Sequence, residues 1–286
     1  MLLGKELINN GLESKVYKVN SVKGPIIIKT KKINGRVNYL FEAYAYNQLI
    51  KLGAKVPKVI DVNVRSITLS LLDGEELDDK IYLFNNSSIF KEIADDLKLC
   101  KKVNFKGYGP AVKMENVFVG RYSNWQDYLD SMYNDLIVLS SKNKQLTKDE
   151  YNILISYWQR NSKNITPTKG NLVHGDFSMG SIFVNENKYA GIIDFGDAFI
   201  GDPIMDLAYF RFKEINKEYG DSLYRLLINQ YLNDSKNDTV EFNNKILLYM
   251  IFWAVKRISH CPNKIIRNKF VEKTKILAKY ISDSYM

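Results

Sequence analysis

The sequence has few residues of the kinds that build disulfide-rich, zinc-binding or membrane-spanning proteins. Its 286 residues include two cysteines, Cys100 and Cys261, which lie far apart and have no zinc-ligating neighbour other than His260. Such a pair supports neither a disulfide framework nor a zinc site, and we expect both thiols to be reduced. The longest apolar run, Ile246 to Val255, is far shorter than the roughly 20 residues of a bilayer-spanning helix. It therefore predicts a buried helix.

Export signals and nucleic-acid-binding clusters are missing as well. The first residues, 1–12, lack a basic start followed by a continuous apolar stretch, so a cytoplasmic protein is expected. The formal net charge is +9, and residues 1–74 hold 12 Lys and Arg against 5 Asp and Glu, compared with 29 against 27 in residues 75–286. The lysines are scattered, as on a solvated face, without interleaved aromatic residues. We expect neither a nucleic-acid nor a membrane partner.

What is present is enough apolar material for one large core or two modest ones, with 45% hydrophobic and 13% aromatic residues. Residues 1–74 have the pattern of a small sheet with one helix. The predicted strands are Ser14–Asn20, Pro25–Thr30 and Ser66–Leu72, and the predicted helix is Asn38–Leu52. Asp73-Gly74 is a turn signal, and the texture of the sequence changes after it.

Residues 75–286 are mainly helical in pattern, with one hairpin. The predicted helices are Ser88–Val103, Asn124–Leu139 and Lys148–Arg160, and the predicted hairpin pairs Ile182–Asn185 with Tyr189–Ile193. Asp202-Pro203 is a good helix start, because Asp can cap the first amides and Pro suits the first turn. Gly220 is expected to end that helix, and two or three helices follow. The predicted fold class is α+β.

Acidic residues gather between positions 174 and 206 in an otherwise basic chain. The acids are Asp176, Glu186, Asp194, Asp197, Asp202 and Asp206, against the single base Lys188. Some are turn and cap residues, which suits Asp202 and Asp197. Asp176 and Asp194, however, follow short apolar segments, where a carboxylate is costly to desolvate without a cation nearby. A divalent metal with a triphosphate would supply that counter-charge.

Three linked motifs in this region resemble a known family. They are His174-Gly175-Asp176, then Ile192-Ile193-Asp194-Phe195-Gly196-Asp197, then Gly201-Asp202-Pro203 followed by Asp206-Leu207-Ala208. Together they look like the signature of aminoglycoside phosphotransferases and their choline kinase and macrolide kinase relatives. The resemblance implies a two-lobed, protein-kinase-like fold. Residues 1–74 would form the nucleotide-binding lobe with the hinge at its end, and residues 75–286 the helical lobe with catalytic loop, metal site and acceptor site.

The resemblance also implies roles for individual residues, and the chemistry of phosphoryl transfer agrees with them. Asp176 would be the catalytic residue that accepts or orients the proton of the acceptor hydroxyl. Asp194 would hold Mg²⁺ on the phosphates of ATP or GTP. The family places an Asn, as second metal ligand, where this chain has Ser181. A Ser hydroxyl can bind magnesium, so the departure weakens the site without abolishing it. His174 would order the catalytic loop, and Asp206 would brace it.

In the small lobe, Lys29 ends the run Ile26 to Ile28, which resembles the strand whose lysine contacts the phosphates. Three successive Ile predict a strand buried on both faces, and a lysine there needs a partner, for which Glu42 on the following helix is the candidate.

Gly11 and Ser14 resemble the nucleotide-covering loop. Main-chain groups near Ser70 and Leu72 occupy the position of the hinge that binds the purine, although an edge strand and turn would look the same.

The acceptor is left open by the sequence. An aminoglycoside or macrolide antibiotic, modified in a resistance role, is one possibility, and a metabolic alcohol such as choline or a sugar is another. Ser181 also motivates a nucleotide-binding pseudokinase. A protein kinase is disfavoured, because His-Gly-Asp replaces His-Arg-Asp and no Ala-Pro-Glu motif follows. The aromatic segments Tyr122 to Tyr133 and Tyr249 to Trp253 are predicted as core rather than acceptor site. The oligomeric state is not indicated.

Overall fold

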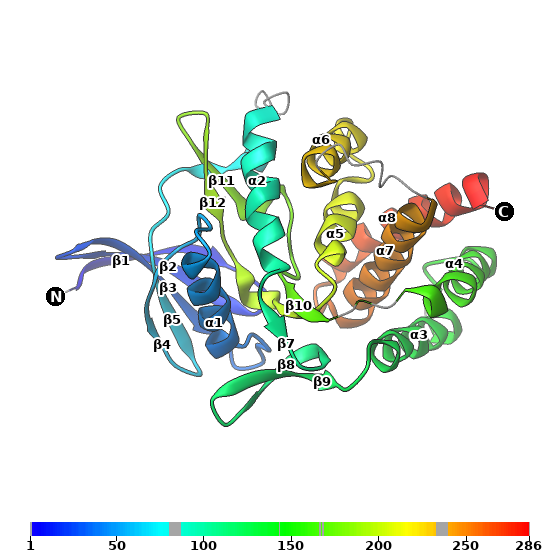
Figure 1. Ribbon diagram of the computed structural model, residues 1–286, viewed down its shortest axis with the longest axis horizontal. Helices are drawn as coiled ribbons and strands as arrows, with labels where there is room; N and C mark the ends of the chain where they lie inside the picture. Colours follow the sequence, from blue (N-terminus) through cyan, green and yellow to red (C-terminus); the bar gives the residue numbers. More distant parts are fainter. Residues whose placement is uncertain are drawn as a thin grey trace. The chain divides into compact units, whose positions relative to one another are not determined.

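The computed structural model describes residues 2–79, 87–142, 144–165, 167, 169–232 and 240–285. The chain is a mixture of strands and helices that divides into two compact units (Figure 1). Unit 1 comprises Met1–Val103 and His174–Phe199, and unit 2 comprises Asn104–Val173 and Ile200–Met286. The predicted α+β class is confirmed. The motifs of Asp176 and Asp194 thus belong to the same compact unit as the N-terminal sheet, whereas Asp202 and Asp206 belong to unit 2.

Unit 1 contains a five-stranded antiparallel sheet in the order β1-β2-β3-β5-β4. Its strands are β1 (Leu2–Asn10), β2 (Ser14–Ser21), β3 (Gly24–Lys31), β4 (Val59–Val62) and β5 (Ser66–Ser70). Strands β2, β3 and β5 were predicted, but β1 and β4 were not. Strand β1 is an edge strand with an irregular register, and both Leu7 and Ile8 are half exposed. Such a strand lacks the alternating pattern that reveals a half-buried one.

Helix α1 (Tyr39–Lys51) follows the sheet closely in sequence and contacts β4 and β5. Asn38 caps it, accepting a hydrogen bond from the Phe41 amide at 3.2 Å, as its residue type favours. The prediction that the strand before this helix is buried on both faces is wrong, because residues 26–28 are only half-buried. Lys29 is the one residue of β3 that is buried.

A second, three-stranded sheet in unit 1 has the order β12-β11-β6. It consists of β6 (Glu75–Glu76), β11 (Ile182–Asn185) and β12 (Lys188–Ile192), and α2 (Ser87–Cys100) packs against β12. The Tyr189 hydroxyl donates to Asp96 of α2 at 2.6 Å. At Gly191, which has a φ of +151°, a Cβ would lie 2.3 Å from the carbonyl oxygen of Lys55. This close approach requires glycine, and it ties β12 to the loop that follows α1.

Unit 2 combines a small sheet with most of the helices (Figure 1). The strand order is β7-β10-β13-β8-β9, with β7 (Asn104–Phe105), β8 (Tyr108–Met114), β9 (Val117–Tyr122), β10 (Gly170–Val173) and β13 (Phe199–Gly201). The helices are α3 (Trp125–Lys142), α4 (Lys148–Asn161), α5 (Ile204–Glu214), α6 (Gly220–Leu232), α7 (Val240–His260) and α8 (Lys264–Tyr285). The hairpin β8-β9 was not predicted from the sequence.

The expectation that Gly220 ends a helix is wrong, because Gly220 begins α6 and α5 ends at Glu214. A Cβ at Gly220 would lie 1.9 Å from the Glu214 carbonyl oxygen, so glycine is needed for the close approach of the chain and not for a helix stop. The start of α5 is as expected: Asp202 Oδ1 accepts a hydrogen bond from the Ile204 amide at 3.1 Å.

The core of unit 2 is aromatic. Trp125 and Tyr128 of α3 pack against Tyr249 and Phe252 of α7, with ring centroids 6.0 Å apart for Trp125 and Tyr249. The apolar run 246–255 lies wholly buried in α7, as predicted. Across the described part of the chain, no helix combines the length and the hydropathy needed to span a membrane.

Candidate active site

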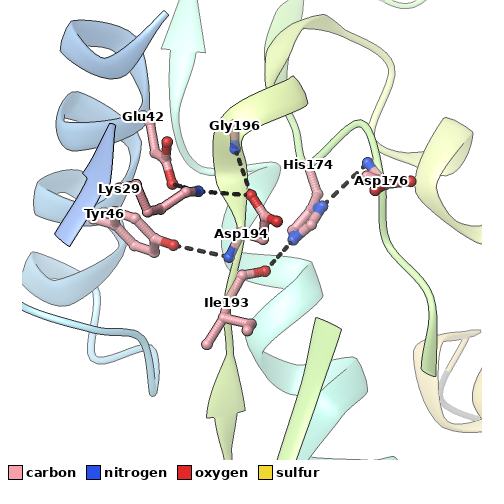
Figure 2. A network of polar contacts seen from close by, with 8 residues as sticks. All are labelled: Lys29, Glu42, Tyr46, His174, Asp176, Ile193, Asp194 and Gly196. Atoms are coloured by element: carbon pink, nitrogen blue, oxygen red, sulfur yellow. Dashed lines mark hydrogen bonds and ion pairs between the residues drawn. The ribbon is translucent and has the colours of Figure 1, made fainter. Parts of the chain in front are cut away.

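Lys29 lies at the centre of a polar network in unit 1 (Figure 2). Lys29 is 6% exposed, and its Nζ lies 2.6 Å from Glu42 Oε1 and 2.8 Å from Asp194 Oδ1. Glu42 faces the lysine from α1, and Asp194 follows β12. The predicted pair of Lys29 and Glu42 is therefore confirmed, and the structure adds Asp194, from a motif far along the chain, to it.

The charges in this network depend on one another. Burial alone would lower the pKa of Lys29, but the carboxylates of Asp194 and Glu42 together raise it well above its ordinary value. Lys29 holds the pKa of Asp194 below its ordinary value. Burial raises the pKa of Glu42, and Lys29 opposes this rise only in part. The lysine is thus firmly cationic and Asp194 is ionised at neutral pH.

Asp194 has an unusual backbone conformation, with φ 69° and ψ 60°. This left-handed region is costly for residues other than glycine, though Asp and Asn tolerate it best. The Asp194 amide donates to the Tyr46 hydroxyl at 2.9 Å, and the Gly196 amide donates to Asp194 Oδ1 at 3.4 Å. The side chain is 57% exposed. The turn therefore presents an ionised carboxylate to solvent directly after an apolar strand.

His174 connects the segment of Asp194 with the loop of Asp176 (Figure 2). Its ring is fully buried, with Nε2 2.8 Å from the Ile193 carbonyl oxygen, and the Asp176 amide donates to Nδ1 at 3.2 Å. A carbonyl oxygen can only accept and an amide can only donate, so these two contacts place a proton of His174 on Nε2. The ring also packs on Phe195 at a centroid distance of 4.4 Å.

Gly175 explains the middle position of the His-Gly-Asp motif. Its φ is +86°, and a Cβ there would lie 2.1 Å from the Asp197 carbonyl oxygen. Glycine is the residue that both the conformation and the space allow. The loop of Asp176 is thereby held against the turn that follows Asp194, and Asp176 itself is half-buried.

Ser181, the predicted second metal ligand, uses its hydroxyl within its own turn. Its Oγ donates to the Ser178 carbonyl oxygen at 2.8 Å and accepts from the Ser178 amide at 3.0 Å, and the residue is 5% exposed. One lone pair of the oxygen remains for a metal. Ser181 also accepts a hydrogen bond from the Ile193 amide through its own carbonyl oxygen, at 2.9 Å.

The other predicted nucleotide-binding residues lie at or just beyond strand ends of the five-stranded sheet. Gly11 lies in the turn between β1 and β2, where its carbonyl oxygen accepts from Lys32 Nζ, and Ser14 begins β2. Ser70 ends β5, with its amide bound to the Lys58 carbonyl oxygen at 2.8 Å. That donor is therefore committed to the sheet. Leu72 lies half-buried just beyond β5, and its hinge role stays a prediction.

Tyr46 was missed by the sequence analysis. It is fully buried on α1, and its ring contacts Phe195 edge-on at a centroid distance of 5.3 Å. The available signal was its position four residues after Glu42, which places both side chains on one face of the helix. In the sequence, a tyrosine at this position is typical of the hydrophobic core. Only the tertiary structure shows that its hydroxyl binds the Asp194 amide.

The donor set fits a hard divalent cation. Mg²⁺ prefers oxygen ligands and is usually held by one or two carboxylates together with substrate phosphates and water. Asp194 offers such a carboxylate, and Ser181 a hydroxyl oxygen. Within the described ranges, no group of three or more His, Cys, Asp or Glu forms a metal cage.

Solved structures share the fold over nearly the whole chain. Aminoglycoside phosphotransferase APH(4)-Ia, as a thermostable mutant in apo form, matches with a TM-score of 0.78 at 13% identity over 100% of this chain and 96% of that one. APH(2")-IIa, in a ternary complex with streptomycin and ATP, matches with 0.62 at 17% identity, over 96% and 91%. A protein from Thermobifida fusca YX-ER1 that is assigned as a fructosamine-3-kinase matches with 0.66 at 13% identity, over 97% and 94%.

Membership follows from a match to the sequence itself. The model of the phosphotransferase enzyme family APH matches residues 6–240, a span that begins in β1, contains every residue of the Lys29 network and ends at the start of α7. The resemblance stated from the three motifs is confirmed, as is the assignment as a small-molecule kinase. The chain belongs to the phosphotransferase enzyme family.

Proposed function

We propose that this protein transfers the γ-phosphate of ATP or GTP to a hydroxyl of a small molecule, with Asp176 as catalytic residue. The observation that carries the proposal is the position of Lys29, bound at once to Glu42 and to Asp194 at 2.6 and 2.8 Å. A cation fixed in this way is available for phosphate oxygens, and the exposed Asp194 carboxylate beside it is available for their metal. Phosphoryl transfer needs such positioning and charge neutralisation more than covalent chemistry.

Asp176 would accept the proton of the acceptor hydroxyl. As the acceptor oxygen bonds to the γ-phosphorus, its proton passes to the carboxylate and ADP or GDP leaves. His174 holds the Asp176 amide at 3.2 Å and the Ile193 carbonyl at 2.8 Å, and so keeps the base in register with the strand that leads to Asp194. Mg²⁺, when bound, would neutralise charge on the phosphates, with Asp194 and Ser181 as its protein ligands.

Solved structures of the same fold guide the choice of donor and acceptor. APH(4)-Ia has been solved with ADP and hygromycin B and with AMP-PNP and hygromycin B, which favours ATP as donor here. An aminoglycoside acceptor, with a resistance role, is the first candidate for this chain. A sugar or amino alcohol is the second, and the likeness to the protein assigned as a fructosamine-3-kinase favours it.

The proposal is tested by phosphate transfer from ATP and GTP, with Mg²⁺, to a panel of aminoglycosides, macrolides, choline and sugars. We expect acceptor-dependent turnover that falls at least about 100-fold in Asp176→Asn, because general-base catalysis contributes roughly 10²- to 10⁴-fold. Asp95→Asn is the matched control, since Asp95 is a partly exposed residue of α2 paired with Lys91 and Lys98. Turnover that survives in Asp176→Asn would refute the role of Asp176. Failure to bind nucleotide would refute the function.

A further inference from the structure

We propose that Tyr46 is the positioning residue that holds the main chain of Asp194 for metal-assisted phosphoryl transfer, an inference that rests on the proposed function. Tyr46 lies on α1 one helical turn after Glu42, and both residues are fully buried. Its hydroxyl oxygen accepts the Asp194 amide at 2.9 Å (Figure 2). Helix α1 is therefore linked to Asp194 in two ways: Glu42 binds Lys29 of β3, which pairs with the Asp194 side chain, and Tyr46 binds the Asp194 amide directly.

The two attachments differ in what they do to the carboxylate. Lys29 occupies Asp194 Oδ1 directly, at 2.8 Å. A lysine that turns to the phosphates and a carboxylate that turns to a metal must both loosen this ion pair. The hydrogen bond to Tyr46 uses only the amide of Asp194, so it leaves both carboxylate oxygens available. Tyr46 can therefore hold Asp194 in the same place before and after nucleotide binds.

The backbone conformation of Asp194 explains why a hydrogen bond to Tyr46 would be needed. A residue with a Cβ at φ 69° and ψ 60° is in a sparsely populated region and persists only where its surroundings fix it. Tyr46 supplies two such constraints to successive residues, because its hydroxyl binds the Asp194 amide and its ring packs edge-on against Phe195 at 5.3 Å. Without the hydroxyl, the amide loses its acceptor and the turn can relax toward more populated conformations.

The hydroxyl remains a neutral acceptor under all ordinary conditions. Burial, and after it the charge of Glu42, raise the pKa of Tyr46 well above its usual value. A neutral phenol accepts the Asp194 amide with a lone pair and keeps its own proton.

The test compares Tyr46→Phe with Tyr151→Phe. Tyr151 is a buried tyrosine of α4 in unit 2 whose hydroxyl has no hydrogen-bond partner among the described residues. Phe keeps the ring and removes only the hydroxyl. Amide hydrogen exchange at Asp194, measured in metal-free and nucleotide-free protein, is expected to be at least about fivefold faster in Tyr46→Phe, which corresponds to the loss of one ordinary hydrogen bond. Tyr151→Phe should leave it unchanged.

Nucleotide binding and turnover provide the second readout. In Tyr46→Phe we expect the Mg²⁺ concentration for half-maximal turnover to rise about fivefold and kcat to fall about tenfold, while the Kd for ATP without Mg²⁺ stays within twofold. Equal exchange at Asp194 in Tyr46→Phe and wild type would overturn the inference, as would equal losses in both tyrosine variants. If the wild type transfers no phosphate, the proposed function fails, whereas the exchange measurement still decides whether Tyr46 holds Asp194.

Discussion

Removal of the Lys29 ammonium should destabilise the protein in a way that depends on its buried partner. In Lys29→Met, Glu42 stays fully buried without the cation that lies 2.6 Å away, and its Oε2 has no other hydrogen-bond partner among the described residues. Breaking a buried ion pair from one side costs about 3–5 kcal/mol. We expect the free energy of unfolding to fall by about 3 kcal/mol, because Glu42 can escape part of the cost by taking up a proton.

Removal of both partners should restore most of that loss. Replacing a buried pair by apolar residues of similar size is often neutral or stabilising, and Asp194, 57% exposed, can be hydrated when Lys29 is absent. The double variant Lys29→Met, Glu42→Leu should therefore lie within about 1 kcal/mol of wild type, so that the second substitution restores about 2 of the roughly 3 kcal/mol lost in Lys29→Met. Both variants should lack phosphate transfer, because the phosphates lose their cation.

Urea denaturation at equilibrium measures these differences, with transfer assays alongside. Lys91→Met is the matched control: its ion pair with Asp95 is exposed, and its loss should cost less than about 0.5 kcal/mol. A double variant as unstable as Lys29→Met would refute the reasoning, since the cost would then arise from lost packing. A single variant as stable as wild type would refute it as well.

Two further substitutions test the metal site and a buried lysine of unit 2. If the Ser181 hydroxyl is a working metal ligand, Ser181→Asn should leave turnover within about threefold of wild type in a Mg²⁺ titration; a gain of tenfold or more would indicate a metal site impaired by serine. Burial lowers the pKa of Lys273 to about 8, so the folded state releases this proton before the unfolded state does, and the contribution of Lys273 to stability rises with pH between about 8 and 10. The neutral amine can still donate to the Lys213 carbonyl and to Asn216. The stability of wild type relative to Lys273→Met, from urea denaturation at pH 7 and pH 10, should thus increase by about 2 kcal/mol. An unchanged or smaller difference at pH 10 would contradict this.

The sequence by itself determined the family, the fold class and most of the chemistry-bearing residues. Local chemistry was sufficient, because His174, Asp176 and Asp194 stand at short fixed spacings in motifs of unusual composition. A lysine that ends an apolar strand needs a partner, which pointed to Glu42 on the next helix. Strands and helices with a regular periodicity were predicted because that pattern is also local in the sequence. The irregular edge strand β1 and the hairpin β8-β9 were not predicted.

Only the tertiary structure decided how these residues act on one another. Tyr46 and Asp194 are separated by 148 positions, and no local pattern links a helix tyrosine to a distant main-chain amide. The same holds for Gly191, where the carbonyl oxygen of Lys55 leaves no room for a Cβ. It also holds for Gly220, which begins α6 and whose close approach to the Glu214 carbonyl oxygen excludes a Cβ. Periodicity and motif spacing report on neighbours along the chain, whereas hydrogen bonds and close approaches between remote segments depend on the packing of the whole unit.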